Sequence, residues 1–408
     1  MNELGYNAKK AAHDCQHLST TQKNAILRDM GQALVDNTQT IINANRIDVY
    51  NAHDSKMSQP LIDRLTLNDT RIQAMKESCD QLIELDDPVG VTLNTTQLEN
   101  GLNIEKISVP LGVIGIIYES RPNVTLDAFA LCFKAGNAVV LKGGKEALNT
   151  NITLESIIRK VLISHNTNPH IIQLIKSTDR ESTLQMMKMN DAIDVLIPRG
   201  SAGLIQAVIQ NSTIPVIETG AGNCHIYIDE SYDETLALQI IENAKLQRLG
   251  VCNAAESLVI HQKAHAILPK IIDQLRTVTF YGDLRSISID PRIQPASQED
   301  FYTEYLDTKL SVKVVDTLEE AIEHINTHNT KHSEAIITTN PSHAETFLND
   351  IDAACVYVNA STRFTDGFEM GMGAEIGIST QKLHARGPMG LKELTSYKYK
   401  IRGEGQVR

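Results

Sequence analysis

The alternation of apolar runs with helical segments between residues 113 and 218 constrains the fold more than any other feature of this chain. In chain order the apolar runs are 113–118, 138–142, 171–175, 192–198 and 214–218, and the segments with helical spacing between them are 123–134, 154–164, 180–189 and 201–210. Strands that alternate with helices of this length predict a parallel, doubly wound sheet with helices on both faces. Ligands of such sheets bind beyond the carboxyl ends of the strands.

The same alternation starts again near residue 225 and predicts a second doubly wound α/β domain. Its expected strands are 225–228, 257–260, 312–315, 335–339 and 356–359, and its expected helices are 234–247, 264–275, 318–327 and 343–349. A run of amphipathic helices precedes the first sheet, over residues 2–85. The polar, alternating segment 90–108 predicts a hairpin, and residues 395–401 are typical of an exposed edge strand.

Composition narrows the class of protein. The chain has 408 residues, of which 42% are hydrophobic and 22% charged, as expected for two or three globular domains. Its net charge of -12 argues against a nucleic acid or an anionic membrane as partner. Six cysteines without paired spacing argue against a disulfide framework and a metal site, and they favour a reducing, cytoplasmic setting. No apolar stretch reaches the length of a membrane span.

Two residues stand out as candidates for chemistry. Glu218 ends an apolar run and is followed by Gly220 and Gly222, so it lies where a buried segment turns sharply. Cys252 lies in a loop between a helical segment and a strand-like run, where a thiol can be positioned as a nucleophile. Structural interpretations stay open for both, because a free cysteine is often a small buried apolar residue and a carboxylate at a strand end is often a helix cap.

Five stretches, in order, carry a resemblance that covers nearly the whole chain. They are VPLGVIGIIYESRPNVTLDAFALCFKAGNAVVLKGGKEA (109–147), IPRGSAGLI (197–205), IPVIETGAGNCHIYID (214–229), QRLGVCNAAESLVIH (247–261) and HARGPMGLKELTSYKYKIRGEG (384–405). The chain resembles the aldehyde dehydrogenase superfamily and, within it, the branch that reduces an acyl phosphate of glutamate. The separation of 34 residues between Glu218 and Cys252 (252 − 218) is also similar to that of the superfamily.

The resemblance implies a reaction and a nucleophile. We expect NADPH-dependent reduction of L-glutamyl 5-phosphate to L-glutamate 5-semialdehyde and phosphate, the second step of proline biosynthesis. Cys252 would form a thioester, and its backbone N–H together with the Asn123 amide would donate to the oxyanion. Asn123 could instead be only a helix N-cap. The alternative function is a hydrolytic, NAD(P)-dependent aldehyde dehydrogenase that releases a free acid.

The role of Glu218 stays open. It matches the carboxylate that activates water in hydrolytic relatives, yet an acyl phosphate reductase has no use for water attack on the thioester. The motif also reads Glu-Thr-Gly-Ala-Gly where the superfamily usually has Glu-Leu-Gly-Gly-Lys. Glu218 is therefore either a proton shuttle or a structural residue.

The resemblance also assigns cofactor-binding residues, since the chain has no Gly-x-Gly-x-x-Gly fingerprint after its first strand. Lys142 would lie near the adenosine, and Lys145 stands where NAD-preferring relatives often have a glutamate. A cation attracts a 2′-phosphate, so we expect NADP(H). Ser201 would hold the pyrophosphate at a helix N-terminus, Glu304 would bind the nicotinamide ribose, and Gly220 would line the cofactor site.

Arginines are expected to recognise the charged substrate, because an acyl phosphate and an amino-acid carboxylate both call for bidentate donors. Arg121 and Arg363 are the candidates, each in a loop beside a matched stretch. Either could also be a surface arginine.

The resemblance further predicts the domains and partners. We expect an NADP-binding domain at 1–92 and 109–222 with part of 362–390 returning to it, a catalytic domain at 223–361, and a β oligomerisation element at 93–108 and 391–408. That element predicts a homodimer or homotetramer. Glutamate kinase is the expected functional partner, as the source of the acyl phosphate.

Overall fold

The computed structural model describes residues 1–408, apart from the side chain of Pro60. The chain divides into two compact units. The first unit comprises Met1–Glu218, Met372–Gly377 and Met389–Arg408, and the second comprises Thr219–Gly371 and Ile378–Pro388. The division thus falls after Glu218, whereas the sequence suggested 222, and the C-terminal part is shared between the units in short pieces.

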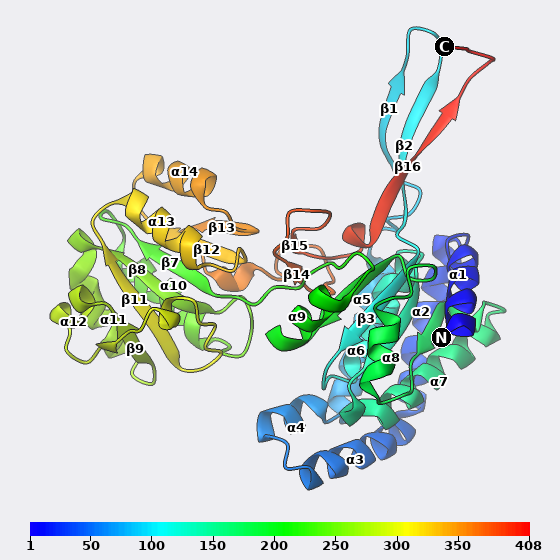
Figure 1. The fold of residues 1–408 in the computed structure, drawn as a ribbon, viewed down its shortest axis with the longest axis horizontal. Helices are drawn as coiled ribbons and strands as arrows, with labels where there is room; N and C mark the ends of the chain where they lie inside the picture. The colour runs from blue at the N-terminus through cyan, green and yellow to red at the C-terminus, as the bar shows by residue number, and fades with distance from the viewer. The chain divides into compact units, whose positions relative to one another are not determined.

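The first unit contains a four-stranded parallel sheet in the order β5-β4-β3-β6. Its strands are β3 (Val113–Tyr118), β4 (Ala138–Gly143), β5 (Ile172–Leu174) and β6 (Val195–Arg199). Every residue of β3 and β4 is buried, which explains their continuous apolar sequences. The helices that connect and follow these strands are α6 (Asn123–Lys134), α7 (Leu148–Ser164), α8 (Arg180–Met186) and α9 (Ala202–Asn211) (Figure 1).

The strand expected at 214–218 is wrong. Only a single parallel bridge joins Val216 to Leu196 of β6. Leu196 donates its N–H to the carbonyl of Pro215, and Ile217 donates to the carbonyl of Leu196. Because proline has no N–H, residue 215 cannot extend the ladder, and the segment leaves the sheet after one bridge.

Helix α7 begins at Leu148, although its apolar spacing predicted a start at 154. The polar first turn is held by the buried carboxylate of Asp48, which accepts the N–H groups of Asn149 (3.2 Å) and Thr150 (2.8 Å). Asp48 belongs to α3 (Thr38–Asp54), about a hundred residues earlier in the chain. A carboxylate at this position also suits the positive end of the helix dipole.

Five helices precede the sheet, as the amphipathic pattern predicted. They are α1 (Asn2–Cys15), α2 (Thr20–Asp36), α3, α4 (Gln59–Leu65) and α5 (Asp69–Glu84). Helix α2 starts with a capping box in which Ser19 and Gln22 satisfy each other's backbone N–H groups. The buried ammonium of Lys23, one turn further on, binds Asp87 at 2.5 Å and the carbonyl of Lys134 at 2.9 Å.

The expected hairpin is present and carries a third strand. β1 (Thr92–Gln97), β2 (Asn103–Pro110) and β16 (Thr395–Arg402) form an antiparallel sheet in the order β1-β2-β16, coloured cyan and red in Figure 1. Lys398 of β16 pairs with Ile107 of β2. All side chains of β1 are exposed, and so are those of Tyr397, Tyr399 and Ile401 on β16.

The second unit is built on a seven-stranded sheet in the order β10-β9-β11-β8-β7-β12-β13, and every strand pair described in it is parallel. The strands are β7 (Cys224–Ile228), β8 (Ala255–His261), β9 (Thr279–Gly282), β10 (Gln294–Pro295), β11 (Lys309–Val315), β12 (Ser333–Ile337) and β13 (Cys355–Val358). The sequence did not predict β9 and β10, which lie at one edge of the sheet. β10 has only two residues, too few to show a period.

Successive residues of the central strands face two separate cores. Ile226 and Ile228 of β7 belong to a cluster with α10 (Glu234–Leu246) and α11 (Leu268–Gln274), whereas Tyr227 packs in a second cluster with α13 (Leu318–His328) and α14 (Pro341–Asp350). The helices therefore cover both faces of the sheet (Figure 1). The short helix α12 (Leu284–Ile289) follows β9. This arrangement confirms the doubly wound α/β fold.

Candidate functional site

Cys252 lies in the loop that joins α10 to β8 in the second unit. It is half-buried, whereas the other five cysteines, Cys15, Cys79, Cys132, Cys224 and Cys355, are buried. The loop approaches the amino end of β8, so this thiol does not follow the general expectation that chemistry lies at the carboxyl ends of parallel strands. Partial exposure makes Cys252 the described thiol that a substrate can reach.

The carbonyl of Cys252 is held by the chain that enters β7. A Cβ atom at Gly222 would lie 1.4 Å from this carbonyl oxygen, so the backbones approach as closely as only glycine allows. Gly222 donates its N–H to Glu304 Oε1 at 2.7 Å, and burial raises the pKa of Glu304 while that hydrogen bond opposes the rise. Cys224 Sγ donates to the same Cys252 carbonyl at 3.2 Å.

The next residue, Asn253, is bound to the turn that contains η5 (Thr362–Phe364). Its Nδ2 donates to the carbonyl of Thr365 at 2.9 Å, and Thr362 Oγ1 donates to the Asn253 carbonyl at 2.7 Å. The Arg363 guanidinium donates to Asn253 Oδ1 and to Gln247 Oε1. The segment 222–224 and the turn at 362–365, which is about 110 residues further along the sequence than Asn253, thus both fix the cysteine loop.

Arg363 is therefore brought to the loop that carries Cys252. Burial lowers the pKa of Arg363 and the neighbouring Arg248 acts in the same direction, whereas the charges of Asp366 and Cys252 raise it. The guanidinium group of arginine is so basic that it stays protonated in proteins. Its positive charge favours the thiolate form of a nearby cysteine.

Asn123 is the first residue of α6, and Pro122 occupies the N-cap position. The interpretation of Asn123 as an N-cap is therefore wrong. Its Nδ2 instead donates to Asp127 Oδ2, one turn further along the helix, at 2.8 Å. Burial raises the pKa of Asp127 to about 6, against the opposing effects of the Asn123 hydrogen bond and the Arg199 charge. Asp127, which nothing in the local sequence distinguishes as a site residue, fixes the orientation of the Asn123 amide.

Glu218 and Arg121 lie in loops of the first unit. Glu218 is its last residue before the division and is half-buried. Arg121 is exposed in the connection from β3 to α6, and its carbonyl accepts the N–H of Val124. Arg121 thus lies in a loop, as the sequence predicted, whereas Glu218 does not end a regular strand, because only a single bridge at Val216 precedes it.

Lys142 and Lys145 lie at the carboxyl end of β4. Lys142 Nζ donates to the carbonyl of Ser177 at 2.8 Å, and burial lowers the pKa of this lysine. Lys145 starts η1 (Lys145–Ala147) and is exposed. The adjacent carboxylate of Glu146 accepts both the N–H and the hydroxyl of Ser120 at 2.7 Å.

Ser201 caps α9, since its hydroxyl accepts the N–H of Leu204 at 3.4 Å. Its own N–H and hydroxyl donate to the carboxylate of Glu119, at 2.7 and 3.0 Å. A carboxylate thus lies at the helix N-terminus where the sequence predicted a pyrophosphate. Glu119 satisfies the donors that a bound anion would use.

Gly220 packs against the segment 378–388 of the second unit. Its N–H donates to the carbonyl of Ile378 at 3.1 Å, and a Cβ atom would lie 2.3 Å from the Thr380 side chain. At Gly220 and at Gly222 a Cβ atom would therefore meet a neighbouring segment of the second unit. The glycines that the sequence marked as a sharp turn are thus required by close packing.

The family follows from these features together with sequence comparison. The sequence model of the Aldehyde dehydrogenase family matches residues 2–310 and 309–399. The chain belongs to the aldehyde dehydrogenase family. Two relatives named gamma-glutamyl phosphate reductase, from Lachnospira eligens and Enterococcus faecalis, are 55% and 53% identical to it, and each alignment covers 100% of this chain and 99% of the relative.

Solved structures agree with this assignment. The crystal structure of gamma-glutamyl phosphate reductase from Thermotoga maritima has a TM-score of 0.98 at 46% identity, over 100% of this chain and 99% of that one. An acetylating aldehyde dehydrogenase from Geobacillus thermoglucosidasius has a TM-score of 0.69 at 17% identity, over 100% of this chain and 97% of that one, and shares the fold. The expected aldehyde-dehydrogenase-like α/β fold is confirmed.

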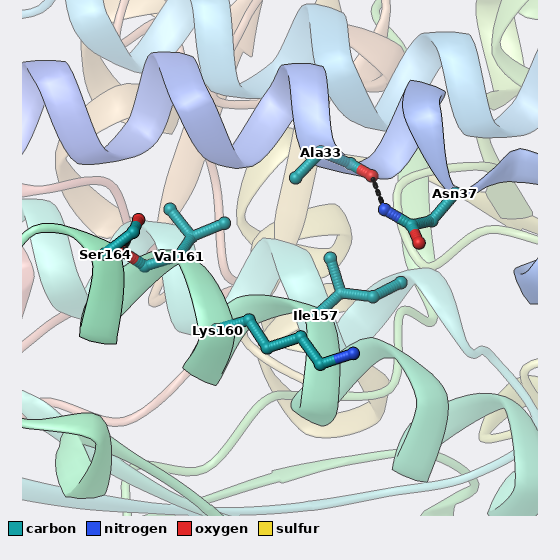
Figure 2. A pocket seen from close by; sticks show the side chains of 6 residues that line it. All are labelled: Ala33, Asn37, Ile157, Lys160, Val161 and Ser164. Carbon is teal, nitrogen blue, oxygen red and sulfur yellow. Dashed lines mark hydrogen bonds between the residues drawn. The ribbon is translucent and has the colours of Figure 1, made fainter.

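A cavity of about 240 Å³ lies elsewhere in this aldehyde dehydrogenase family member, between α2 and α7 of the first unit (Figure 2). Its lining residues are Ala33, Asn37, Ile157, Lys160, Val161 and Ser164. Lys160 is the one side chain among them that carries a charge, and none of the predicted site residues takes part. Among the described residues, no helix is both long and apolar enough to cross a membrane.

Proposed function

We propose that this chain reduces L-glutamyl 5-phosphate to L-glutamate 5-semialdehyde and phosphate, the step of proline biosynthesis that the name of its relatives denotes. Full-length identity of 55% to a gamma-glutamyl phosphate reductase supports the substrate. The observation that carries the chemistry is the half-buried Cys252 in a loop fixed on both flanks. A hydrolytic function, the alternative from the sequence, does not accord with the name of these relatives.

In the proposed mechanism the Cys252 thiolate attacks the acyl carbon, and phosphate leaves with the electron pair of the broken C–O bond. The product is a thioester on Cys252. When bound, the nicotinamide cofactor supplies the hydride that takes this carbonyl to the aldehyde level. The Cys252 sulfur then leaves as the carbonyl re-forms, which regenerates the thiolate.

Charged and polar groups of both units are assigned to these steps. Arg363 favours the thiolate and, with Arg121, is assigned to the anionic substrate. Asn123 has two N–H bonds on its amide; one donates to Asp127, and we assign the other to the oxyanion together with the Cys252 backbone N–H. Glu218 is left with the two roles of proton shuttle or structural residue, because departure of phosphate requires no activated water.

We further propose NADP(H) as the cofactor, within a family whose members use NAD or NADP. Lys142 and the exposed Lys145 would offer cations for a 2′-phosphate. The nearest carboxylate in sequence, Glu146, accepts two hydrogen bonds from Ser120 and is thus directed toward the connection after β3. Ser201, Gly220 and Glu304 stay proposed cofactor residues, and Ser201 would have to exchange Glu119 for the pyrophosphate.

An oligomer and a supplying enzyme complete the proposal. The exposed side chains of β1 and β16 support a homodimer or homotetramer formed through that sheet. The substrate is a labile acyl phosphate, so a glutamate kinase must supply it nearby. Six free cysteines support the cytoplasm as the location.

The reverse reaction tests the proposed function. Purified protein is mixed with glutamate 5-semialdehyde, with NADP or NAD, with or without inorganic phosphate, and nicotinamide reduction is followed by absorbance. We expect a signal that requires phosphate and is larger with NADP. Signal without phosphate would mean that water attacks the thioester, with Glu218 as general base, and would overturn the proposal.

The nucleophile is tested in the same assay. Cys252→Ala is expected to lower turnover by at least about a thousandfold, because it removes the covalent route. Cys355→Ala, a buried cysteine of the same unit, is the matched control and should keep its activity. Near-normal turnover of folded Cys252→Ala would exclude the thioester mechanism.

A further inference from the structure

A buried ion pair joins the two ends of the cysteine loop. Lys245 lies in the last turn of α10 and Glu256 is the second residue of β8, so the loop 247–254 with Cys252 runs between them. Lys245 Nζ lies 2.6 Å from Glu256 Oε2, and both side chains are 0% exposed. Such a pair contributes little net stability compared with apolar side chains of equal size, because burying two charges is costly. Its presence at this place calls for another explanation.

The second carboxylate oxygen of Glu256 connects the pair to a further segment. Glu256 Oε1 accepts the N–H of Leu306 at 3.2 Å, and Leu306 has a φ of 52°, a left-handed conformation that is uncommon for leucine. Two residues before it, Glu304 accepts the N–H of Gly222, the residue whose backbone touches the Cys252 carbonyl. A continuous set of contacts within the second unit thus runs from the pair to Cys252.

The geometry of this set constrains the loop in two ways. The ion pair fixes the distance between the end of α10 and the start of β8, and the 304–306 segment fixes Gly222 against the carbonyl of Cys252. An apolar pair could fill the same volume. It could not accept the N–H of Leu306, and it could not fix the distance between α10 and β8 through two charged atoms.

We propose that Lys245 and Glu256 are positioning residues that set the orientation of the Cys252 thiol. The inference rests on the proposed function only in taking Cys252 as the nucleophile. It does not depend on which acyl group the thiol attacks. Loss of the pair should therefore impair the reactivity of Cys252 even where the fold is retained.

The test separates stability from positioning. The variants are Lys245→Met, Glu256→Leu and the double variant, each assayed for melting temperature, kcat, KM and the rate at which iodoacetamide alkylates Cys252, identified by peptide mass spectrometry. Each single variant leaves a buried charge without its partner and should lower the melting temperature, whereas the double variant should regain most of it. We expect alkylation and kcat of the double variant to stay at least about tenfold below the wild type.

A second buried pair serves as the matched control. Lys23 and Asp87 of the first unit lie 2.5 Å apart, with 2% and 12% of their side chains exposed. Lys23→Met should lower the melting temperature yet leave the alkylation rate of Cys252 unchanged at a temperature where the protein is folded. If only the Lys245–Glu256 variants lose thiol reactivity, the loss comes from the position of that pair beside the cysteine loop. It does not then come from the general cost of breaking a buried ion pair.

Two results would overturn the inference. One is a folded double variant with the alkylation rate and kcat of the wild type, which would make the pair purely structural. If the double variant does not fold, Glu256→Asp decides, since it keeps both charges but shortens the side chain by one methylene; an unchanged alkylation rate would then refute the inference. If wild-type protein shows no phosphate-dependent turnover while these variants still lose alkylation, the proposed function fails and the inference stands.

Discussion

The loop around Cys252 and the loops that carry the proposed cofactor residues are built in different ways. Cys252 and Asn253 have four hydrogen-bonding partners in other segments, namely Cys224, Thr362, Arg363 and Thr365, and Gly222 is in direct contact. By contrast, Lys145, which is proposed for the 2′-phosphate of the cofactor, is exposed. A nucleophile must meet an acyl carbon at a fixed angle and distance, whereas a cofactor must enter and leave in each turnover.

The difference shows where sequence changes should act. Substitutions in the Cys252 loop should change kcat, because they disturb the geometry of bond formation. Substitution of the exposed Lys145 should change KM for the cofactor and leave kcat nearly as it is, because this side chain is proposed to supply binding strength. The following predictions test this division.

Among the tests of this division, the largest effect is expected at Gly222. In Gly222→Ala the new Cβ would lie 1.4 Å from the Cys252 carbonyl oxygen, so one of the two backbones must shift. A displacement of about 1 Å at a reacting group can lower the rate by about a hundredfold, and we expect a fall of that order in kcat. Steady-state kinetics and circular dichroism provide the measurement.

Gly203→Ala is the control for Gly222→Ala. Gly203 lies inside α9, and the nearest atom to its Cβ position is the Ser201 hydroxyl at 4.0 Å, so the alanine should raise or maintain the melting temperature. Wild-type kcat in folded Gly222→Ala would show that the cysteine loop tolerates displacement and would remove the contrast between the two regions.

A smaller effect is expected at Lys145. Lys145→Glu replaces an exposed cation by an anion at the position proposed for the 2′-phosphate. We expect kcat/KM for NADP to fall by about tenfold, mainly through KM, while kcat/KM for NAD changes little. Lys160→Glu, a lysine of α7 that lines the separate cavity, makes the same charge change elsewhere in the first unit. If kcat/KM for NADP falls equally in both variants, the change in net charge explains the effect. Lys145 would then not be the residue that binds the 2′-phosphate.

The sequence predicted these regions unequally well for a physical reason. β3 and β4 were recognised because every residue is buried, and the position of Cys252 followed from the helix before it and the strand after it. These are local properties. The start of α7 depends on Asp48, and the end of the sheet at 214–218 depends on Pro215, whose missing N–H matters only once the neighbouring strand is known.

Partnerships between distant residues were likewise beyond the sequence. The pairing of Glu119 with Ser201 and of Glu304 with Gly222 joins residues 82 apart in each case. Lys245 and Glu256 are only 11 apart, but nothing local distinguishes them from exposed charges. The one available signal of a buried ion pair was a charged residue within a buried strand. Glu256 is such a residue in the strand Ala255–His261.

The smallest expected effect concerns Asp127, the one carboxylate that fixes a proposed catalytic side chain in the first unit. Burial raises its pKa to about 6 in the folded protein, above the ordinary value of 3.8. The folded state therefore binds more protons than the unfolded state between these values, so this contribution to the free energy of unfolding is full below about pH 4 and is lost as the pH rises through about 6. Asp127→Asn has no carboxyl group to titrate at this position, so its free energy of unfolding should decline less steeply with pH over that range. The two slopes should differ by the equivalent of up to about one bound proton per molecule.

Urea unfolding of the wild type and of Asp127→Asn at several pH values between about 4 and 7 measures this difference directly, since all other titrating groups are common to both proteins. Asp191→Asn, an exposed aspartate of the same unit, is the control and should follow the wild-type curve. If the Asp127→Asn and wild-type curves run parallel, Asp127 titrates alike in both states and is not held in a buried contact with Asn123. The first unit would then lack a fixed catalytic side chain, and the contrast with the Cys252 loop would be sharper than the hydrogen bond at 2.8 Å implies.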